Sequence, residues 1–152
     1  MSNSFIAPLQ DRGAVVISGA GAVQFLNGIV TNEVGHLHEG EAAHTGLLSP
    51  QGKILFDFLS LRVADGFLLD VAAAKAGDLV KRLSMYKLRA AVEIKDVSDT
   101  FSVLALWGND PSLPGITVAQ SFTDPRHAAL GMRILADSRF VTDIVSGSKG
   151  LE

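Results

Sequence analysis

The pattern of apolar and polar residues along the chain predicts two helices separated by runs of short strands. Residues 13–18 are mostly apolar and β-favouring, and the Gly19-Ala20-Gly21 break follows them. Beyond the break, apolar residues take the i, i+3, i+4 and i+7 spacing of one buried helix face: Val23, Phe25, Leu26, Ile29 and Val30. A second amphipathic helix is predicted over about 74–86, with Leu79, Leu83 and Tyr86 on one face.

The other apolar runs are short and predict strands at about 42–48, 53–63, 67–71, 92–97, 101–107 and 131–136. The Asp65-Gly66 pair lies between two of these runs and favours a tight hairpin, because it supplies the positive φ angles of such a turn. Loops are predicted around residues 109–111 and 114–115. Strands that follow one another through hairpins, with a helix after the first and the fourth, predict an α+β fold with a mainly antiparallel sheet and flanking helices.

Composition narrows the class of protein. The chain has 152 residues, of which 47% are hydrophobic and 19% charged, so we expect one globular domain with a substantial core. It has no apolar run of the roughly 20 residues that a membrane span requires, and its N-terminus lacks the pattern of a signal peptide. The absence of cysteine excludes disulfides and thiolate metal sites, and a net charge of −3 argues against nucleic-acid binding. We therefore predict a cytoplasmic protein with neither membrane nor nucleic acid as a partner.

The Gly19-Ala20-Gly21 segment has part of the pattern that binds dinucleotides. A strand, a Gly-x-Gly turn and a helix start would place a pyrophosphate at the helix N-terminus. However, Gln24 occupies the position of the third glycine, and no acid follows about 20 residues later in a second strand. The segment therefore favours a tight strand-to-helix turn, for which Ser18 is a candidate cap.

Three histidines, His36, His38 and His44, raise the question of a metal site. Two of them lie two residues apart in a polar stretch at about 35–41, and no pattern of aspartate or glutamate completes a ligand set. A polar loop accounts for this grouping, and we predict no metal site.

The strand predicted over 53–63 carries an acid, Asp57, among apolar residues. It follows the Ser-Pro-Gln-Gly turn of residues 49–52, and the residues on either side of Asp57 show little alternation. That pattern indicates a strand covered on both faces, where a carboxylate needs a hydrogen-bond donor or a polar cavity. From the residues alone, a functional and a structural role for Asp57 stay equally open.

Two further polar groups are candidates for binding. Tyr86 and Arg89 follow the second helix, and a tyrosine ring stacks on flat heterocycles while a guanidinium suits a carboxylate. The residues alone favour a core position for Tyr86 and a solvated Arg89. Asp124, Arg126 and Arg133 form the second group, for which ion pairing is the simpler interpretation.

Five segments in order along nearly the whole chain resemble the folate-binding YgfZ family, relatives of the glycine cleavage T-protein, an aminomethyltransferase. The most specific is Leu-Leu-Ser-Pro-Gln-Gly-Lys at 47–53, which leads to Asp57. The others are Asp-Arg-Gly at 11–13, Phe-Leu-Asn-Gly-Ile-Val-Thr-Asn-Glu-Val at 25–34, Tyr-Lys-Leu-Arg-Ala-Ala-Val at 86–92, and Asp-Pro-Arg with Leu-Gly-Met-Arg within 124–133.

The resemblance implies an aminomethyltransferase-like α+β fold that holds tetrahydrofolate or a derivative in a central channel. In the transferases, an acid on the strand after the glycine turn assists transfer of a methylene group from an aminomethyl-lipoyl carrier protein. Asp57 matches that acid, so we predict it as the catalytic residue and as part of the folate site. Asn32, Gln51, Tyr86 and Arg89 are the other predicted cofactor-binding residues.

Departures from the transferase pattern favour the YgfZ side of the family. Phe56 stands where the transferases have a second acid, and Glu33 replaces the usual aspartate. YgfZ proteins assist the maturation or repair of iron–sulfur enzymes, and their Lys-Gly-Cys-x-x-Gly-Gln-Glu segment, which lies further along in full-length members, is absent here. The resemblance thus implies a folate-binding domain whose partners are iron–sulfur client enzymes or a lipoyl carrier protein.

We predict that residues 1–150 form this folate-binding domain as the N-terminal portion of a longer protein. The final Leu-Glu pair, 151–152, is predicted to be a cloning scar. Two alternatives are a working aminomethyltransferase and a non-catalytic interaction domain in which Asp57 is structural. Whether the whole protein is an enzyme stays open, and we expect the fragment alone to be inactive.

Overall fold

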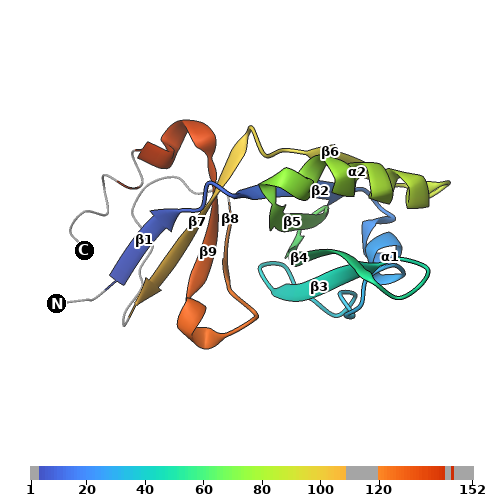
Figure 1. The fold of residues 1–152 in the computed structure, drawn as a ribbon, viewed down its shortest axis with the longest axis horizontal. Coiled ribbons are helices and arrows are strands. Elements are labelled where there is room, and N and C mark those ends of the chain that lie inside the picture. Colours follow the sequence, from blue (N-terminus) through green and yellow to red (C-terminus); the bar gives the residue numbers. More distant parts are fainter. Residues whose placement is uncertain (1–3, 109–119, 143–144, 146–152) are drawn as a thin grey trace.

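A computed structural model describes residues 4–108, 120–142 and 145, which form two antiparallel sheets side by side (Figure 1). The five-stranded sheet has the order β3-β4-β5-β2-β6 and the four-stranded sheet the order β1-β7-β9-β8. The elements are β1 (Ser4–Pro8), β2 (Arg12–Ser18), α1 (Ala22–Asn27), β3 (Ala42–Leu48), β4 (Ile54–Val63), β5 (Gly66–Ala72), α2 (Ala73–Lys87), β6 (Glu93–Asp96), β7 (Phe101–Gly108), β8 (Gln120–Thr123), β9 (Met132–Asp137) and the 3-10 turns Ala128–Leu130 and Ser138–Phe140. The predicted α+β fold with antiparallel sheets and flanking helices is confirmed.

One face of the five-stranded sheet packs against both helices. Helix α2 buries Ala76, Leu79 and Leu83, which recur at the spacing of a single helix face. Tyr86 is half-buried and packs against the same core. The core on this side also contains Val15, Ile17, Phe25, Leu26, Phe58, Phe67 and Leu69.

The opposite face of this sheet packs against the four-stranded sheet. Because side chains alternate along a strand, residues two apart in β2, β4 and β5 point to this second face. The second core that results contains Ala14, Leu59, Leu61 and Leu68 from the first sheet and Val103, Phe122 and Leu135 from the other. The chain crosses between the sheets before β2 and after β6, as Figure 1 shows.

The predicted turns follow from close backbone contacts. Residues 64–65 join β4 to β5, and Gly66, with φ +151°, pairs with Val63 to close the hairpin. A Cβ on Gly66 would lie 2.0 Å from the carbonyl oxygen of Ile17, so only glycine fits there. Gly19 likewise has φ +121° and approaches the backbone of Ala91. The tight strand-to-helix turn is therefore confirmed, but the predicted Ser18 cap is wrong, because Gly21 is the N-cap and no side chain caps α1.

Other boundaries differ from the prediction. Helix α1 ends at Asn27 instead of reaching Val30, which forms a bridge with Leu47 at the edge of β3. Strands β1 and β8 were not predicted, because both are short and lack a clear alternation. The loops predicted at 109–111 and 114–115 and the predicted scar at 151–152 lie outside the described residues. No helix in the described part of the chain is long and apolar enough to cross a membrane.

Candidate ligand-binding site

Asp57 lies on β4, on the face that carries Leu59 and Leu61, and its side chain is 71% exposed. The prediction of a strand covered on both faces is wrong at this residue. The pairing of β4 with β5 runs only from Leu59 to Val63, so the first half of β4 pairs with β3 alone. Opposite Asp57, β3 has Gly46, which contributes no side chain. The carboxylate therefore stands at an open end of the sheet.

His44 holds the Asp57 carboxylate from the neighbouring strand. The distance between His44 Nε2 and Asp57 Oδ2 is 3.1 Å, and both residues lie on the same face of the sheet. Asn32 in turn donates from Nδ2 to the carbonyl oxygen of His44 at 2.9 Å. The structure thus connects two of the predicted site residues, Asn32 and Asp57, through a histidine whose role the sequence did not reveal.

A small cavity adjoins Asp57 where β4 and β5 diverge. Its volume is about 250 Å³, and its lining includes Asp57, Phe56 and Lys75. The Lys75 ammonium lies 5.9 Å from the centre of the Phe56 ring. Helix α2 thereby contributes one cationic side chain, Lys75, to the lining of this cavity. Asp57 lies on one face of the sheet, whereas Phe56 and Lys75 belong to the α2 side, so the cavity at the open edge of β4 is lined from both faces. Its lining combines polar and apolar groups, as is typical of small-molecule sites.

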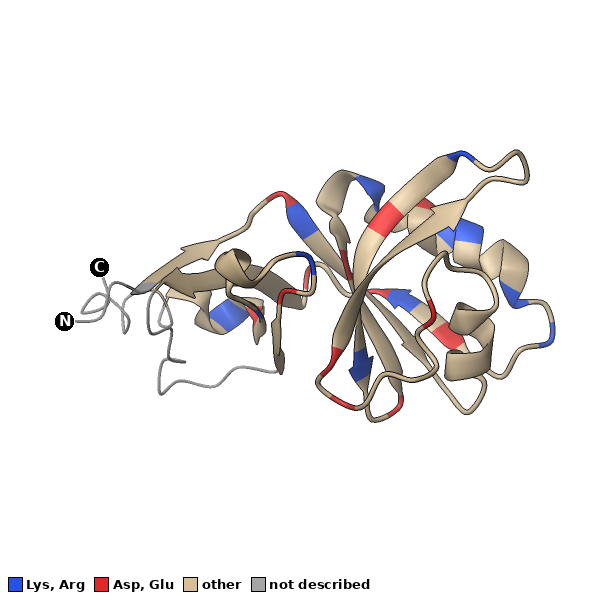
Figure 2. Ribbon diagram, turned by 90° about the horizontal axis from the view of Figure 1, so that it is seen from below, with Lys and Arg blue, Asp and Glu red and all other residues tan. Residues whose placement is uncertain are grey.

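A buried ion network lies next to this site, where the two sheets meet. The Asp70 carboxylate on β5 is 1% exposed and accepts hydrogen bonds from Arg12 Nε and Arg133 Nη1, both at 2.7 Å. Arg12 also donates to the backbone oxygen of Asp70 at 2.7 Å. Arg133 belongs to β9, so this network bonds one sheet to the other. Figure 2 shows acidic and basic positions together at that junction.

Asp124, after β8, extends the network to Arg126. Its Oδ2 is 2.6 Å from Arg126 Nη2 and 3.6 Å from Arg133 Nε. Burial alone would raise the pKa of the Asp124 carboxyl, but the hydrogen bonds from Arg126 and the charges of Arg126 and Arg133 outweigh it and lower that pKa. The predicted ion pairing of Asp124, Arg126 and Arg133 is confirmed.

The remaining predicted site residues lie apart from Asp57. Gln51 is exposed in the turn before β4, where its backbone N–H donates to Ser49 Oγ at 3.2 Å. Tyr86 belongs to α2, which covers the other face of the sheet, and Arg89 is exposed just after that helix. Their roles in ligand binding stay predictions.

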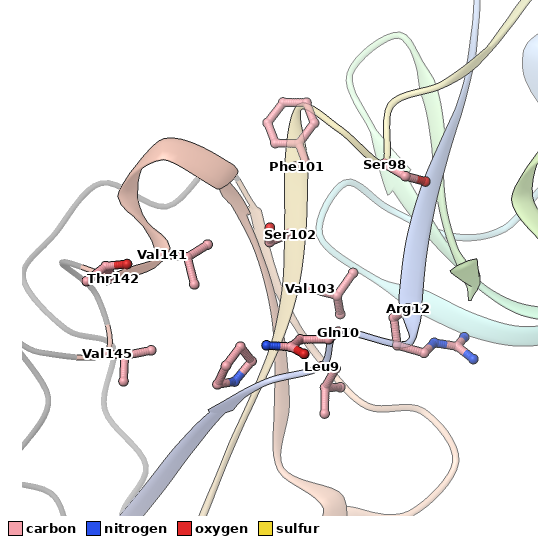
Figure 3. Close-up of a pocket in the computed structure, with 11 residues that line it drawn as sticks. Leu9, Gln10, Arg12, Ser98, Phe101, Ser102, Val103, Val141, Thr142 and Val145 are labelled. Carbon is pink, nitrogen blue, oxygen red and sulfur yellow. The ribbon is translucent and has the colours of Figure 1, made fainter. Parts of the chain in front are cut away.

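Another cavity lies at the junction between the two sheets, and Arg12 is one of its lining residues (Figure 3). Its volume is about 520 Å³, and Arg12 is its only titratable lining residue among the described ones. The Arg12 guanidinium points away from Val141 and Val145 and is bonded to Asp70. Since this cavity offers apolar surface and hydroxyl groups without a free charged side chain, the chemistry favours the Asp57 cavity as the ligand site.

The chain is similar in sequence to proteins that carry two different names. The "Iron-sulfur cluster assembly factor IBA57 homolog, mitochondrial" of Mycosarcoma maydis is 28% identical over 160 residues, which cover 97% of this chain and 40% of the relative. The "Aminomethyltransferase" of Clostridium botulinum is 32% identical over 97 residues, which cover 63% of this chain and 26% of the relative. The chain thus spans about two fifths or less of the length of these relatives.

The fold is that of a solved aminomethyltransferase. The structure of glycine cleavage system aminomethyltransferase T from Bartonella henselae superposes with a TM-score of 0.76 at 17% identity, over 99% of this chain and 47% of that one. The GCVT N-terminal domain profile matches residues 6–113. The resemblance to the YgfZ family and the T-protein is confirmed, and the chain belongs to the GCVT N-terminal domain family.

Proposed function

We propose that this chain is the tetrahydrofolate-binding domain of a protein that assists iron–sulfur enzyme maturation or repair. The relative named as an iron–sulfur cluster assembly factor aligns with 97% of the chain, whereas the relative named as an aminomethyltransferase aligns with 63%. Phe56, in place of a second acid, points in the same direction. The observation that carries the folate proposal is the exposed Asp57 carboxylate beside a cavity in a GCVT-type fold.

The Asp57 cavity suits part of a reduced folate. Its volume of about 250 Å³ is below the roughly 300–1,000 Å³ of sites that enclose a drug-sized ligand. It would therefore take one ring system, with the rest of the molecule outside it. A carboxylate accepts hydrogen bonds from the N–H groups of a reduced pterin, and the apolar residues of the lining offer contact to the rest of the ring. When bound, tetrahydrofolate supplies the nitrogens that carry one-carbon groups.

Asp57→Asn tests this proposal. It removes the charge and keeps the shape, so a charge-assisted hydrogen bond to the ligand becomes a neutral one. We expect the tetrahydrofolate Kd from calorimetry to rise about tenfold or more, which corresponds to roughly 1.5 kcal/mol or above. Asp78→Asn, at an exposed acid on α2, is the control and should leave the Kd unchanged.

Two results would contradict the proposal. One is a wild-type protein that gives no binding heat with saturating tetrahydrofolate. The other is a D57N variant that binds like the wild type but melts at a lower temperature, which is the outcome expected of the interaction-domain alternative. Asp57 is largely exposed, so a fall in melting temperature is not the result that we expect.

Aminomethyltransferase activity is the second candidate, supported by the fold and by the 32% identity to a protein of that name. A transferase would release ammonia from an aminomethylated lipoyl carrier protein when given tetrahydrofolate. In our proposal this release is absent, and the partners are iron–sulfur client enzymes. A cytoplasmic location stays a proposal, and the relative from Mycosarcoma maydis is named as mitochondrial.

A further inference from the structure

The chain contains the same short motif twice, Asp124-Pro125-Arg126 and Asp137-Ser138-Arg139, and three internal bonds are common to both copies; in the second, Nε also donates to Oδ2 at 3.2 Å. In each copy the aspartate Oδ1 accepts from the arginine backbone N–H, at 3.0 and 2.9 Å, and from Nε, at 3.0 Å in both. In each copy Oδ2 accepts from Nη2, at 2.6 and 2.7 Å. The local fold of the motif is therefore the same in both places.

The surroundings of the two copies differ. The Asp124 side chain is 1% exposed and that of Arg126 is 35% exposed, against 26% for Asp137 and 79% for Arg139. Arg139 extends over the neighbouring Phe140 ring. Turn formation alone explains the second copy, since Asp137 caps the short 3-10 turn that follows it. It does not explain why the first copy fixes its arginine with a buried carboxylate.

The ion network joins Arg126 to β5, the strand that neighbours β4 and its Asp57. Asp124 contacts Arg133, and Arg133 donates to Asp70 on β5 at 2.7 Å. Hydrogen bonds to Asp124 raise the pKa of Arg126 despite its burial, and the negative charges of Asp124, Asp70 and Asp57 raise it further. Asp70 is paired with Leu59, which lies two residues along β4 from Asp57 and on the same face of the sheet, so the network that holds Arg126 reaches the neighbourhood of Asp57.

One edge of the Arg126 guanidinium remains available. Within the described part of the chain, its side-chain hydrogen bonds run from Nε and Nη2 to Asp124, and Nη1 takes no part in them. A guanidinium held in this way loses little conformational freedom when it binds a ligand, because Asp124 has already fixed its plane. The region therefore presents a fixed donor from one sheet and an acceptor, Asp57, from the other.

We infer that Arg126 is a ligand-binding residue, which donates from its free edge to an acceptor oxygen of the ligand whose N–H groups Asp57 accepts. This inference rests on the proposed folate function and names a second contact for the same ligand. Reduced folates carry such oxygens in two places, the ring oxo group and the carbonyl and carboxylate groups of the tail. Paired donor and acceptor side chains at fixed positions would select molecules with both kinds of group.

Arg126→Gln and its matched control, Arg139→Gln, test the inference by calorimetry with tetrahydrofolate. Loss of a hydrogen bond from a charged donor is expected to weaken binding about tenfold or more for R126Q, and R139Q should stay within about twofold of the wild type. A structural role predicts instead that R126Q melts at a lower temperature while its Kd at 15 °C or below stays within twofold of the wild type. That result would overturn the inference.

The same calorimetry with a tetrahydropterin that lacks the tail identifies which ligand oxygen Arg126 binds. If R126Q weakens both ligands, the ring oxo group is bound, and if only tetrahydrofolate is weakened, the tail is bound. Either result supports the contact. If R126Q does not fold, Arg126→Lys keeps a cation for Asp124 but loses the fork, and unchanged binding by R126K would overturn the inference. A wild type that fails to bind refutes the folate proposal, whereas a binding wild type with unaffected variants refutes the Arg126 contact alone.

Discussion

Replacement of Asp70 by asparagine is expected to destabilise the junction between the two sheets. The Asp70 carboxylate is 1% exposed and forms ion pairs with two arginines, Arg12 from its own sheet and Arg133 from the other. Asparagine has nearly the same shape but no charge. The substitution therefore tests the electrostatic part of the junction and leaves the packing of Leu59 and Leu68 against the second sheet intact.

The loss of unfolding free energy in D70N depends on the hydrogen bonds and ion pairs that the two arginines keep. Removal of one partner from a buried ion pair costs about 3–5 kcal/mol. Here the cost is reduced, because Arg12 keeps its 2.7 Å bond to the Asp70 backbone oxygen and Arg133 keeps Asp124 at 3.6 Å. We therefore expect a loss of about 2–3 kcal/mol of unfolding free energy. For a domain of this size, that corresponds to a fall in Tm of about 4–12 °C.

Urea unfolding and thermal melting, both followed by circular dichroism, measure this loss. Asp137→Asn is the control, since its partner Arg139 is 79% exposed and the substitution should leave both midpoints unchanged. The D70N deficit should also persist in 0.5 M salt, because screening acts weakly on a buried pair. A D70N protein within about 0.5 kcal/mol of the wild type would refute the assignment of the junction to this network.

Two other predictions concern the turns and the response to acid. Gly66→Ala should lower the free energy of unfolding in urea by more than about 2 kcal/mol, because the new Cβ would lie 2.0 Å from the Ile17 carbonyl oxygen and φ is +151°. Gly77→Ala is the control, since a Cβ there meets open space in α2, and it should raise the free energy of unfolding by about 0.5–1 kcal/mol. Comparable losses in both variants would contradict this account. Because the folded-state pKa of Asp124 is lowered from 3.8, its stabilising contribution is present above pH 3.8 and lost as the pH falls through the folded value. Unfolding free energies at pH 5 and 2.5 should therefore fall less in D124N than in the wild type, and equal falls would exclude Asp124 as a source of acid sensitivity.

Much of the five-stranded sheet could be predicted from the sequence, because its signals are local. The 3.6-residue spacing of Leu79 and Leu83 indicated α2, and Asp65-Gly66 indicated the hairpin between β4 and β5. Strand β1 gave no such signal. It has five residues and owes its place to pairing with β7, about 100 positions away in the sequence, as in the pair Phe5 and Trp107. Only a tertiary contact defines an element of that kind.

The site was predictable in part for the same reason. The sequence marked Asp57 as an acid in an apolar strand, but its exposure depends on where the β4–β5 pairing stops, at Leu59 opposite Asp70. His44 was grouped with two loop histidines because of its proximity in sequence. The signal that could have separated it was the hairpin register, since the turn at 49–53 sets Gly46 opposite Asp57 and so brings His44 to the same face.

The repeated Asp-x-Arg motif shows why a short motif does not define a role by itself. Both copies share the same three bonds, so sequence and local geometry assign the same turn to each. What differs is how far each aspartate carboxylate is exposed to solvent. Asp137 is 26% exposed and its partner Arg139 79%, so solvent weakens their pairing, whereas at Asp124 burial makes loss of the partner costly and so fixes the guanidinium in one orientation. A fixed, partly exposed cation in the network next to Asp57 is suited to recognise a ligand, and the 79% exposed Arg139 has no such neighbour. It follows that R126Q and R139Q should differ in their Kd for tetrahydrofolate, although both arginines form the same kind of turn.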